Sequence, residues 1–132
     1  MKPPHITSRL GTEFGEALRT MVLRTPGAVA GVVSDDEGDA IDYAHDPDRI
    51  DGLDVQLLGA QLGPPLFRLR DTAHDQGLEH PLLLIETLSH NLVASPVGGV
   101  FVIALLLDRR ANLGRAMACF TRGRDTLQAL LA

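Results

Sequence analysis

The stretch that most constrains the fold of this chain runs from Leu92 to Met117, LVASPVGGVFVIALLLDRRANLGRAM. Residues 92–96 are a short apolar segment, and Val97-Gly98-Gly99 has the composition of a tight turn. Residues 100–107 are apolar at every position. A short continuous apolar run is typical of a strand that is covered on both faces. We therefore predict a β-hairpin whose second strand, 100–107, lies at the centre of a sheet.

Two polar residues after this hairpin mark the start of a final helix. Asp108 and Asn112 both suit a helix N-terminus, because their side-chain oxygens accept hydrogen bonds from its free backbone N–H groups. Apolar residues then recur at helical spacing at Leu113, Met117, Phe120, Leu127, Leu130 and Leu131. This spacing predicts a helix with one buried side.

A first helix is predicted over residues 8–24. Thr7 or Ser8 suits its N-terminal cap, and apolar residues recur at helical spacing as far as Val22. The helix is expected to end at Thr25-Pro26-Gly27, because proline disfavours a helical conformation in the residue before it.

A second hairpin is predicted after this helix. Residues 28–33 are apolar and β-branched, residues 40–44 alternate between apolar and polar, and residues 34–39 between them are turn-forming and acidic. An acidic turn also suggests a calcium loop. The calcium-loop pattern fails here, because Val33 and Ala44 fall at positions that need liganding side chains.

A long helix is predicted over residues 50–75. Its apolar residues form two stripes, with Ile50, Leu53, Leu57 and Ala60 in one and Val55, Leu58 and Leu62 in the other. A helix that is apolar on two sides is buried on two sides, so we expect one side to face the sheet and the other a partner molecule. Gly63-Pro64-Pro65 interrupts the pattern, because proline removes a backbone donor and clashes with the preceding turn. We expect a kink or break there.

The remaining segment, residues 81–87, is predicted to be a strand that ends at the turn Ser89-His90-Asn91. The order is then helix, two strands, helix, three strands, helix, which indicates a small α+β domain. A length of 132 residues suits one domain with its own core. Residues 1–7 contain two prolines and are predicted to be a flexible tail, leaving 8–132 as the domain.

Composition excludes several classes of protein. A net charge of −5 argues against binding to the phosphate backbone of nucleic acids, which requires clustered Lys and Arg. Aromatic residues make up 4% of the chain and Trp is absent, so the core must be aliphatic. A small domain this rich in Leu is expected to have more apolar surface than one protomer can bury, which favours an oligomer.

The sequence also bears on compartment. Cys119 is the single cysteine, which excludes a disulfide framework and a cysteine-based zinc site. The first ten residues lack the apolar segment of a signal peptide, and the longest apolar run is far shorter than the roughly 20 residues that span a bilayer. We expect a cytoplasmic protein without a membrane span.

No catalytic motif is legible. The chain contains no GxxxxGK[ST] phosphate-binding loop, its five histidines lack metal-ligand spacing, and no serine lies within G-x-S-x-G. Cys119 lies near the apolar stripe of the final helix and is interpreted as a core thiol. The residues alone predict no enzyme, no metal site and no cofactor.

Three stretches resemble the Roadblock/LC7 family. PGAVAGVVSDDEGDAIDYA, residues 26–44, resembles the family's first hairpin, and LVASPVGGVFVIALLLD, residues 92–108, resembles its last. ANLGRAM, residues 111–117, resembles the start of the closing helix, with Asn112-Leu113-Gly114 the most distinctive triplet. The similarity extends roughly from Phe14 to Phe120.

This resemblance implies a central antiparallel five-stranded sheet, with the long helix on one face and the terminal helices on the other. It implies a homodimer in which the second helices pack together and the middle strands pair edge to edge. It further implies a non-enzymatic module that binds and regulates a small Ras-like GTPase, activation included, or that serves as a dimeric adaptor. Family members bind no nucleotide, and where they accelerate hydrolysis they hold the GTPase in its active arrangement without an arginine finger.

The residues expected at the dimer interface are Leu53, Leu57, Leu58, Gln61, Leu62, Leu83 and Ile85. Arg109, Arg110 and Arg115 are candidates for contact with the acidic surface or phosphates of a GTPase, although a solvated helix start explains them equally well. The alternative function is a profilin/PAS-like sensor with a small molecule between sheet and helix. Such a site needs a cavity with convergent polar groups, which these apolar strands supply poorly.

Overall fold

The structure, a computed structural model, describes residues 7–8 and 11–131 and consists of one sheet between helices. The elements are β1 (Thr7–Ser8), α1 (Glu13–Arg24), β2 (Ala28–Asp35), β3 (Ala40–His45), α2 (Gly52–Asp75), β4 (Leu83–Glu86), β5 (His90–Val97), β6 (Phe101–Asp108) and α3 (Leu113–Leu131). The strands pair antiparallel in the order β1-β3-β2-β6-β5-β4. The predicted α+β fold with five antiparallel strands is confirmed, and the two-residue β1 is added at one edge.

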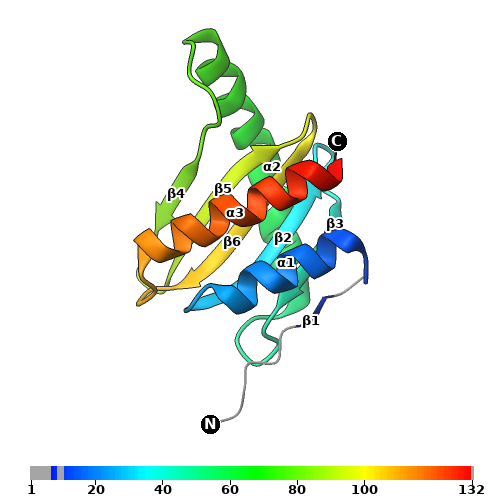
Figure 1. Ribbon diagram of the computed structural model, residues 1–132, viewed down its shortest axis with the longest axis vertical. Helices are drawn as coiled ribbons and strands as arrows, with labels where there is room; N and C mark the ends of the chain where they lie inside the picture. The colour runs from blue at the N-terminus through cyan, green and yellow to red at the C-terminus, as the bar shows by residue number, and fades with distance from the viewer. Residues whose placement is uncertain (1–6, 9–10, 132) are drawn as a thin grey trace.

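The helices cover both faces of the sheet, as predicted. In Figure 1, α1 and α3 lie side by side in front of the strands and α2 lies behind them. Leu18 and Phe120 belong to the core on the α1–α3 side, and Val55 and Leu66 belong to the core on the α2 side. Side chains of successive residues in a strand point to opposite faces, so each strand between the helix layers contributes side chains to both cores.

The strand β6 lies at the centre of the sheet. It pairs with β2 on one side and β5 on the other, and its residues from Val102 to Leu105 are buried. The prediction for the apolar run is therefore confirmed. The hairpin turn between β5 and β6 contains Gly98 at a φ of +62°, a conformation that glycine adopts without steric cost.

The predicted start of the first helix at Ser8 is wrong, because Ser8 lies in β1 and Thr12 caps α1. The Thr12 hydroxyl oxygen accepts a hydrogen bond from the Gly15 N–H at 3.1 Å. The N–H and hydroxyl of Thr12 in turn donate to the buried carboxylate of Asp42 in β3, at 3.1 and 2.7 Å. The start of α1 is thus fixed by a contact between residues that are 30 positions apart in sequence. The sequence pattern around Thr12 does not reveal this contact. The predicted tail, residues 1–7, lies outside the described residues except for Thr7 in β1.

The sequence predicts a kink or a break at Gly63-Pro64-Pro65. The helix α2 runs unbroken through Pro64 and Pro65, so the break is wrong. A proline in a helix interior costs about 3 kcal/mol, because it cannot donate to the carbonyl four residues earlier. Gly63 relieves part of the crowding, since it has no Cβ to clash with the ring of the following proline. Beyond the prolines, Leu66 is fully buried, and the Arg70 guanidinium donates to the Gly99 carbonyl at 2.6 Å. These contacts hold the second half of α2, whose last turns extend past the end of the sheet (Figure 1).

The helix α2 approaches the sheet closely at Gly59. A Cβ at this position would clash with the Ser34 hydroxyl and lie 3.0 Å from the Val32 side chain in β2. The absence of a side chain at Gly59 therefore permits direct contact between helix and strand. None of the helices within the described residues is long and apolar enough to cross a membrane.

Candidate functional site

The described residues contain no group of three or more His, Cys, Asp or Glu side chains placed to hold a metal ion. The features that stand out are surfaces: an exposed apolar helix face, an open strand edge, a cluster of arginines and a groove between helices. We describe each surface from its residues.

The outward side of α2 carries exposed leucines at helical spacing. Leu53 is 60% exposed and Leu57 is 49% exposed, and both project from the first half of the helix. Gln61 lies one helical turn after Leu57 and is also exposed. Leu58, the residue after Leu57, is half-buried. We call these four residues the α2 face. Exposed apolar side chains that lie together in this way mark surfaces that contact other proteins.

Leu62 differs from the other residues predicted for the dimer interface. It is 7% exposed and packs with Val55 and Leu66 in the core on the α2 side. It therefore lies beneath the α2 face and supports it from within the protomer.

The strand β4 forms the edge of the sheet opposite to β1. Among the described strands it pairs with β5 alone, so the N–H and C=O groups along its outer edge can pair with another strand. Leu83 packs towards the core on the α2 side, and Ile85 points to the same face because side chains alternate along a strand. Ile85 is 36% exposed. The predicted interface residues of β4 and those of the α2 face thus belong to the same layer of the molecule.

The arginine cluster, Arg109, Arg110 and Arg115, lies at the junction of β6 and α3. All three residues are exposed. The Arg109 guanidinium donates to the Leu88 carbonyl in the β4–β5 turn at 3.3 Å, which places its charge at the end of the sheet near β4. The backbone N–H of Arg115 donates to the Asn112 side chain at 3.0 Å, so Asn112 caps α3, one of the two caps predicted.

Asp108 organises the base of this cluster. Its carboxylate accepts a hydrogen bond from the Arg110 backbone N–H at 2.8 Å and forms an ion pair with Arg49. The hydrogen bond from the Arg110 N–H, followed by that from Arg49, lowers the pKa of Asp108 below its ordinary value. Asp108 therefore neutralises Arg49, whereas the arginine side chains of the cluster form no ion pair among the described residues.

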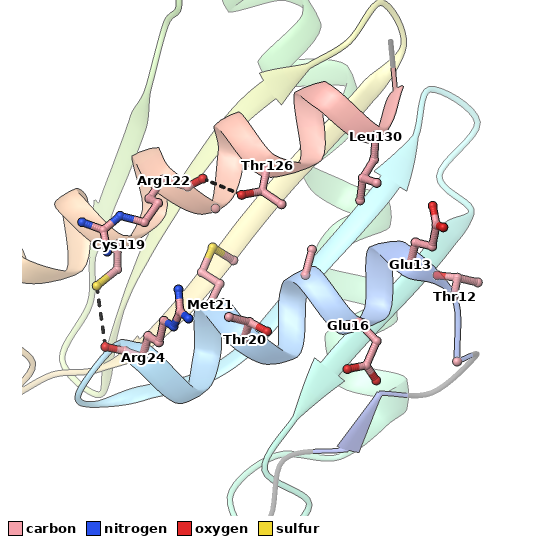
Figure 2. Close-up of a pocket in the computed structure, with 13 residues that line it drawn as sticks. Thr12, Glu13, Glu16, Thr20, Met21, Arg24, Cys119, Arg122, Thr126 and Leu130 are labelled. Carbon is pink, nitrogen blue, oxygen red and sulfur yellow. Dashed lines mark hydrogen bonds between the residues drawn. The ribbon is translucent and has the colours of Figure 1, made fainter.

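The groove between α1 and α3 was not predicted from the sequence. It has a volume of about 580 Å³. Figure 2 shows Arg24, Arg122 and Cys119 at one end of it and Glu13 and Leu130 at the other. The lining residues that the structure describes belong to α1, to α3 or to the two positions before α1: Gly11, Thr12, Glu13, Glu16, Ala17, Thr20, Met21, Arg24, Cys119, Arg122, Gly123, Thr126 and Leu130. We call it the α1–α3 groove.

These positions bear on two further expectations. Cys119 is half-buried at the edge of the groove, with its thiol 3.6 Å from the Arg24 carbonyl, so the interpretation as a core thiol is wrong. The described lining of the α1–α3 groove contains no strand residue, so this groove is not the cavity between sheet and helix that a profilin/PAS-like sensor needs. The close contact of Gly59 with Val32 and Ser34 also leaves no room for a ligand at that point between α2 and the sheet.

Comparison with known proteins shows what the fold is similar to. No protein-family model matches the chain, and no curated protein sequence matches it. Among solved structures, the gliding protein MglB from Thermus thermophilus has a TM-score of 0.76 at 16% identity, over 89% of this chain and 87% of that one. Myxococcus xanthus MglB has a TM-score of 0.72 at 20% identity, over 92% of this chain and 97% of that one. A Roadblock/LC7 domain from Streptomyces avermitilis has a TM-score of 0.71 at 19% identity, over 88% of this chain and 95% of that one. The chain therefore has the fold of the Roadblock/LC7 and MglB structures.

Proposed function

We propose that this protein is a non-enzymatic homodimeric module that binds and regulates a small Ras-like GTPase. The observation that carries the proposal is the combination of a Roadblock/LC7 fold with an exposed apolar face on α2. The shared fold supports a GTPase-regulating or adaptor role, and the apolar face supports association with another protein surface.

The α2 face and the β4 edge suit contact with a second copy of the chain. Leu53 and Leu57 would each be removed from water by an opposing helix, which stabilises an association by about 25 cal/mol per Å² of apolar surface buried. The open edge of β4 would add backbone hydrogen bonds to a second β4. Identical surfaces meet in this way at a two-fold axis, where each patch contacts its own copy.

The arginine cluster is proposed as a contact for the GTPase. Arg109 and Arg110 are exposed, and the Arg109 guanidinium contacts the β4–β5 turn at the end of the sheet. Guanidinium groups attract acidic surfaces and phosphates, and this attraction raises the rate of association more than the final affinity. Their role is to position the GTPase, which retains its own catalytic residues.

The experiment that tests this function is GTP hydrolysis by a Ras-like GTPase from the same genome, with and without stoichiometric protein, combined with co-elution of the pair. Faster hydrolysis together with a complex identifies a GTPase-activating regulator. A complex without acceleration identifies an adaptor or an inhibitor, according to the rate. If every GTPase of that genome neither elutes with the protein nor changes its hydrolysis rate, the proposal is wrong.

A further inference from the structure

We propose that the α1–α3 groove binds an amphipathic helix of a partner protein, with carboxylates at one end of the bound segment and basic groups at the other. This surface lies on the face of the sheet opposite to α2 (Figure 1). It therefore stays open when α2 is covered by a second copy, and the proposal does not depend on GTPase binding.

The shape of the groove fits a helix. Its floor is apolar where α1 and α3 meet, since Met21 is 4% exposed and a Cβ at Gly123 would lie 2.5 Å from the Met21 sulfur. Small side chains follow along both walls, with Ala17 and Thr20 on α1 and Thr126 on α3. The helix α1 has 12 residues and is therefore about 18 Å long, which matches three turns of a bound helix. Grooves of this kind bind an amphipathic helix through its apolar face.

The charges along the groove identify the chemistry of the occupant. The side chains of Glu13 and Glu16 lie towards one end, and those of Arg24 and Arg122 lie at the other (Figure 2). All four are exposed, and among the described residues none of them forms an ion pair. A partner helix therefore fits best when it carries carboxylates over the arginines and ammonium groups over the glutamates, about 11 residues apart at 1.5 Å of rise per residue.

The first measurement is binding of a synthetic peptide to the full-length protein. The probe is a fluorescein-labelled peptide of about four helical turns, with Glu in the first turn, Leu and Ala along one face, and Lys in the last turn. A comparison peptide has Lys at both ends, so that one end is mismatched in either orientation. We expect saturable binding of the first peptide by fluorescence anisotropy and weaker binding of the second.

Cys119 reports where the peptide binds. It is the single cysteine of the chain, and it lies at the arginine end of the groove. We expect the bound peptide to slow the reaction of Cys119 with a thiol reagent in proportion to occupancy. A peptide that binds while the thiol reacts at an unchanged rate binds elsewhere, which overturns the proposal.

Matched variants test the charge and the shape separately. Arg122→Glu is expected to weaken binding of the Glu/Lys peptide about tenfold and to strengthen binding of the Lys/Lys peptide. Arg68→Glu, the same change at an exposed site on α2, is the control and should alter neither affinity. Thr126→Trp places a large ring in the groove from an exposed position and should abolish binding at an unchanged melting temperature.

Three further results would overturn the proposal. The first is no saturable binding of the Glu/Lys peptide at about 1 mM. The second is binding that Arg122→Glu and Thr126→Trp leave unchanged. The third is a change in oligomeric state caused by Thr126→Trp, which would show that a second copy of this chain occupies the groove.

Discussion

At the scale of single residues, Asp42 connects the start of α1 to the sheet. Its buried carboxylate accepts hydrogen bonds from Thr12 and from the Tyr43 backbone N–H at 2.8 Å. Hydrogen bonds to a charged group are worth more than neutral ones, and loss of one partner leaves buried donors without an acceptor. This residue is therefore a structural determinant of the α1–α3 groove, which begins beside Thr12.

We predict that Asp42→Ala lowers the free energy of unfolding by about 2–3 kcal/mol. Urea denaturation followed by circular dichroism measures the change. Asp36→Ala removes a carboxylate from the exposed β2–β3 turn and should stay within about 0.5 kcal/mol of the parent. Equal effects of the two variants would show that Asp42 has no special part in the start of α1.

The lowered pKa of Asp108 predicts a pH dependence of stability. Because the hydrogen bond from the Arg110 N–H and the pair with Arg49 lower its pKa in the folded state, the unfolded chain takes up the proton first as pH falls. The stabilising contribution is complete above the ordinary aspartate pKa of 3.8 and is lost as pH falls through the lower, folded pKa. Asp108→Asn should melt below the parent protein at pH 7, and the difference should shrink as the pH drops below 3.8. A difference that is constant with pH would contradict this account.

At the scale of elements, the contact between α2 and the sheet depends on Gly59. We predict that Gly59→Ala destabilises the protein by about 1–3 kcal/mol, because the new methyl group clashes with Ser34 and Val32, although alanine favours a helix. Gly99→Ala is the control, since an added Cβ there meets nothing within 4 Å. Thermal unfolding of the two variants provides the comparison, and a gain in stability for Gly59→Ala would refute the close packing.

Elements whose signals are local could be predicted from the sequence. Three such features are the apolar run of β6, the Asn112 cap and the turn before Phe101. Neighbouring residues in the chain determine each of them, and the structure has them within a few residues of the predicted positions. The order of elements also indicated the correct fold class. Interface residues on α2 and β4 remain predictions, although all but Leu62 lie exposed or half-buried in one layer.

Features that depend on distant contacts could not be predicted. The start of α1 depends on Asp42 in β3, and the continuity of α2 depends on the burial of Leu66. The α1–α3 groove forms where Met21 meets Gly123, about a hundred positions later in the chain. A glycine within the last helix was the only local signal, and glycine in a helix is not specific for a groove.

At the scale of the whole molecule, the two faces of the sheet have different proposed partners: a second copy of the chain on the α2 side and a helix of another protein on the α1–α3 side. The first assignment gives a direct prediction. Leu57→Asp should convert the dimer to a monomer, because a charge would be buried unpaired against the opposing helix. Leu23→Asp is the matched control on α1, where the leucine is 42% exposed and lies in the opposite layer. Light scattering during size-exclusion chromatography measures the mass, and a dimeric Leu57→Asp variant would remove the α2 face from the interface.

The measurement that tests the central claim most directly is binding of a Ras-like GTPase, loaded with a non-hydrolysable GTP analogue, to the parent protein and to Arg110→Glu, with Arg68→Glu as the control at another exposed arginine. The account predicts a complex that forms with the GTP-analogue state, weakens with rising salt because of the arginine cluster, and is weaker in Arg110→Glu than in Arg68→Glu. Binding that ignores the bound nucleotide would indicate an adaptor in place of a regulator. Failure of the parent protein to bind any Ras-like GTPase of its genome would contradict the claim.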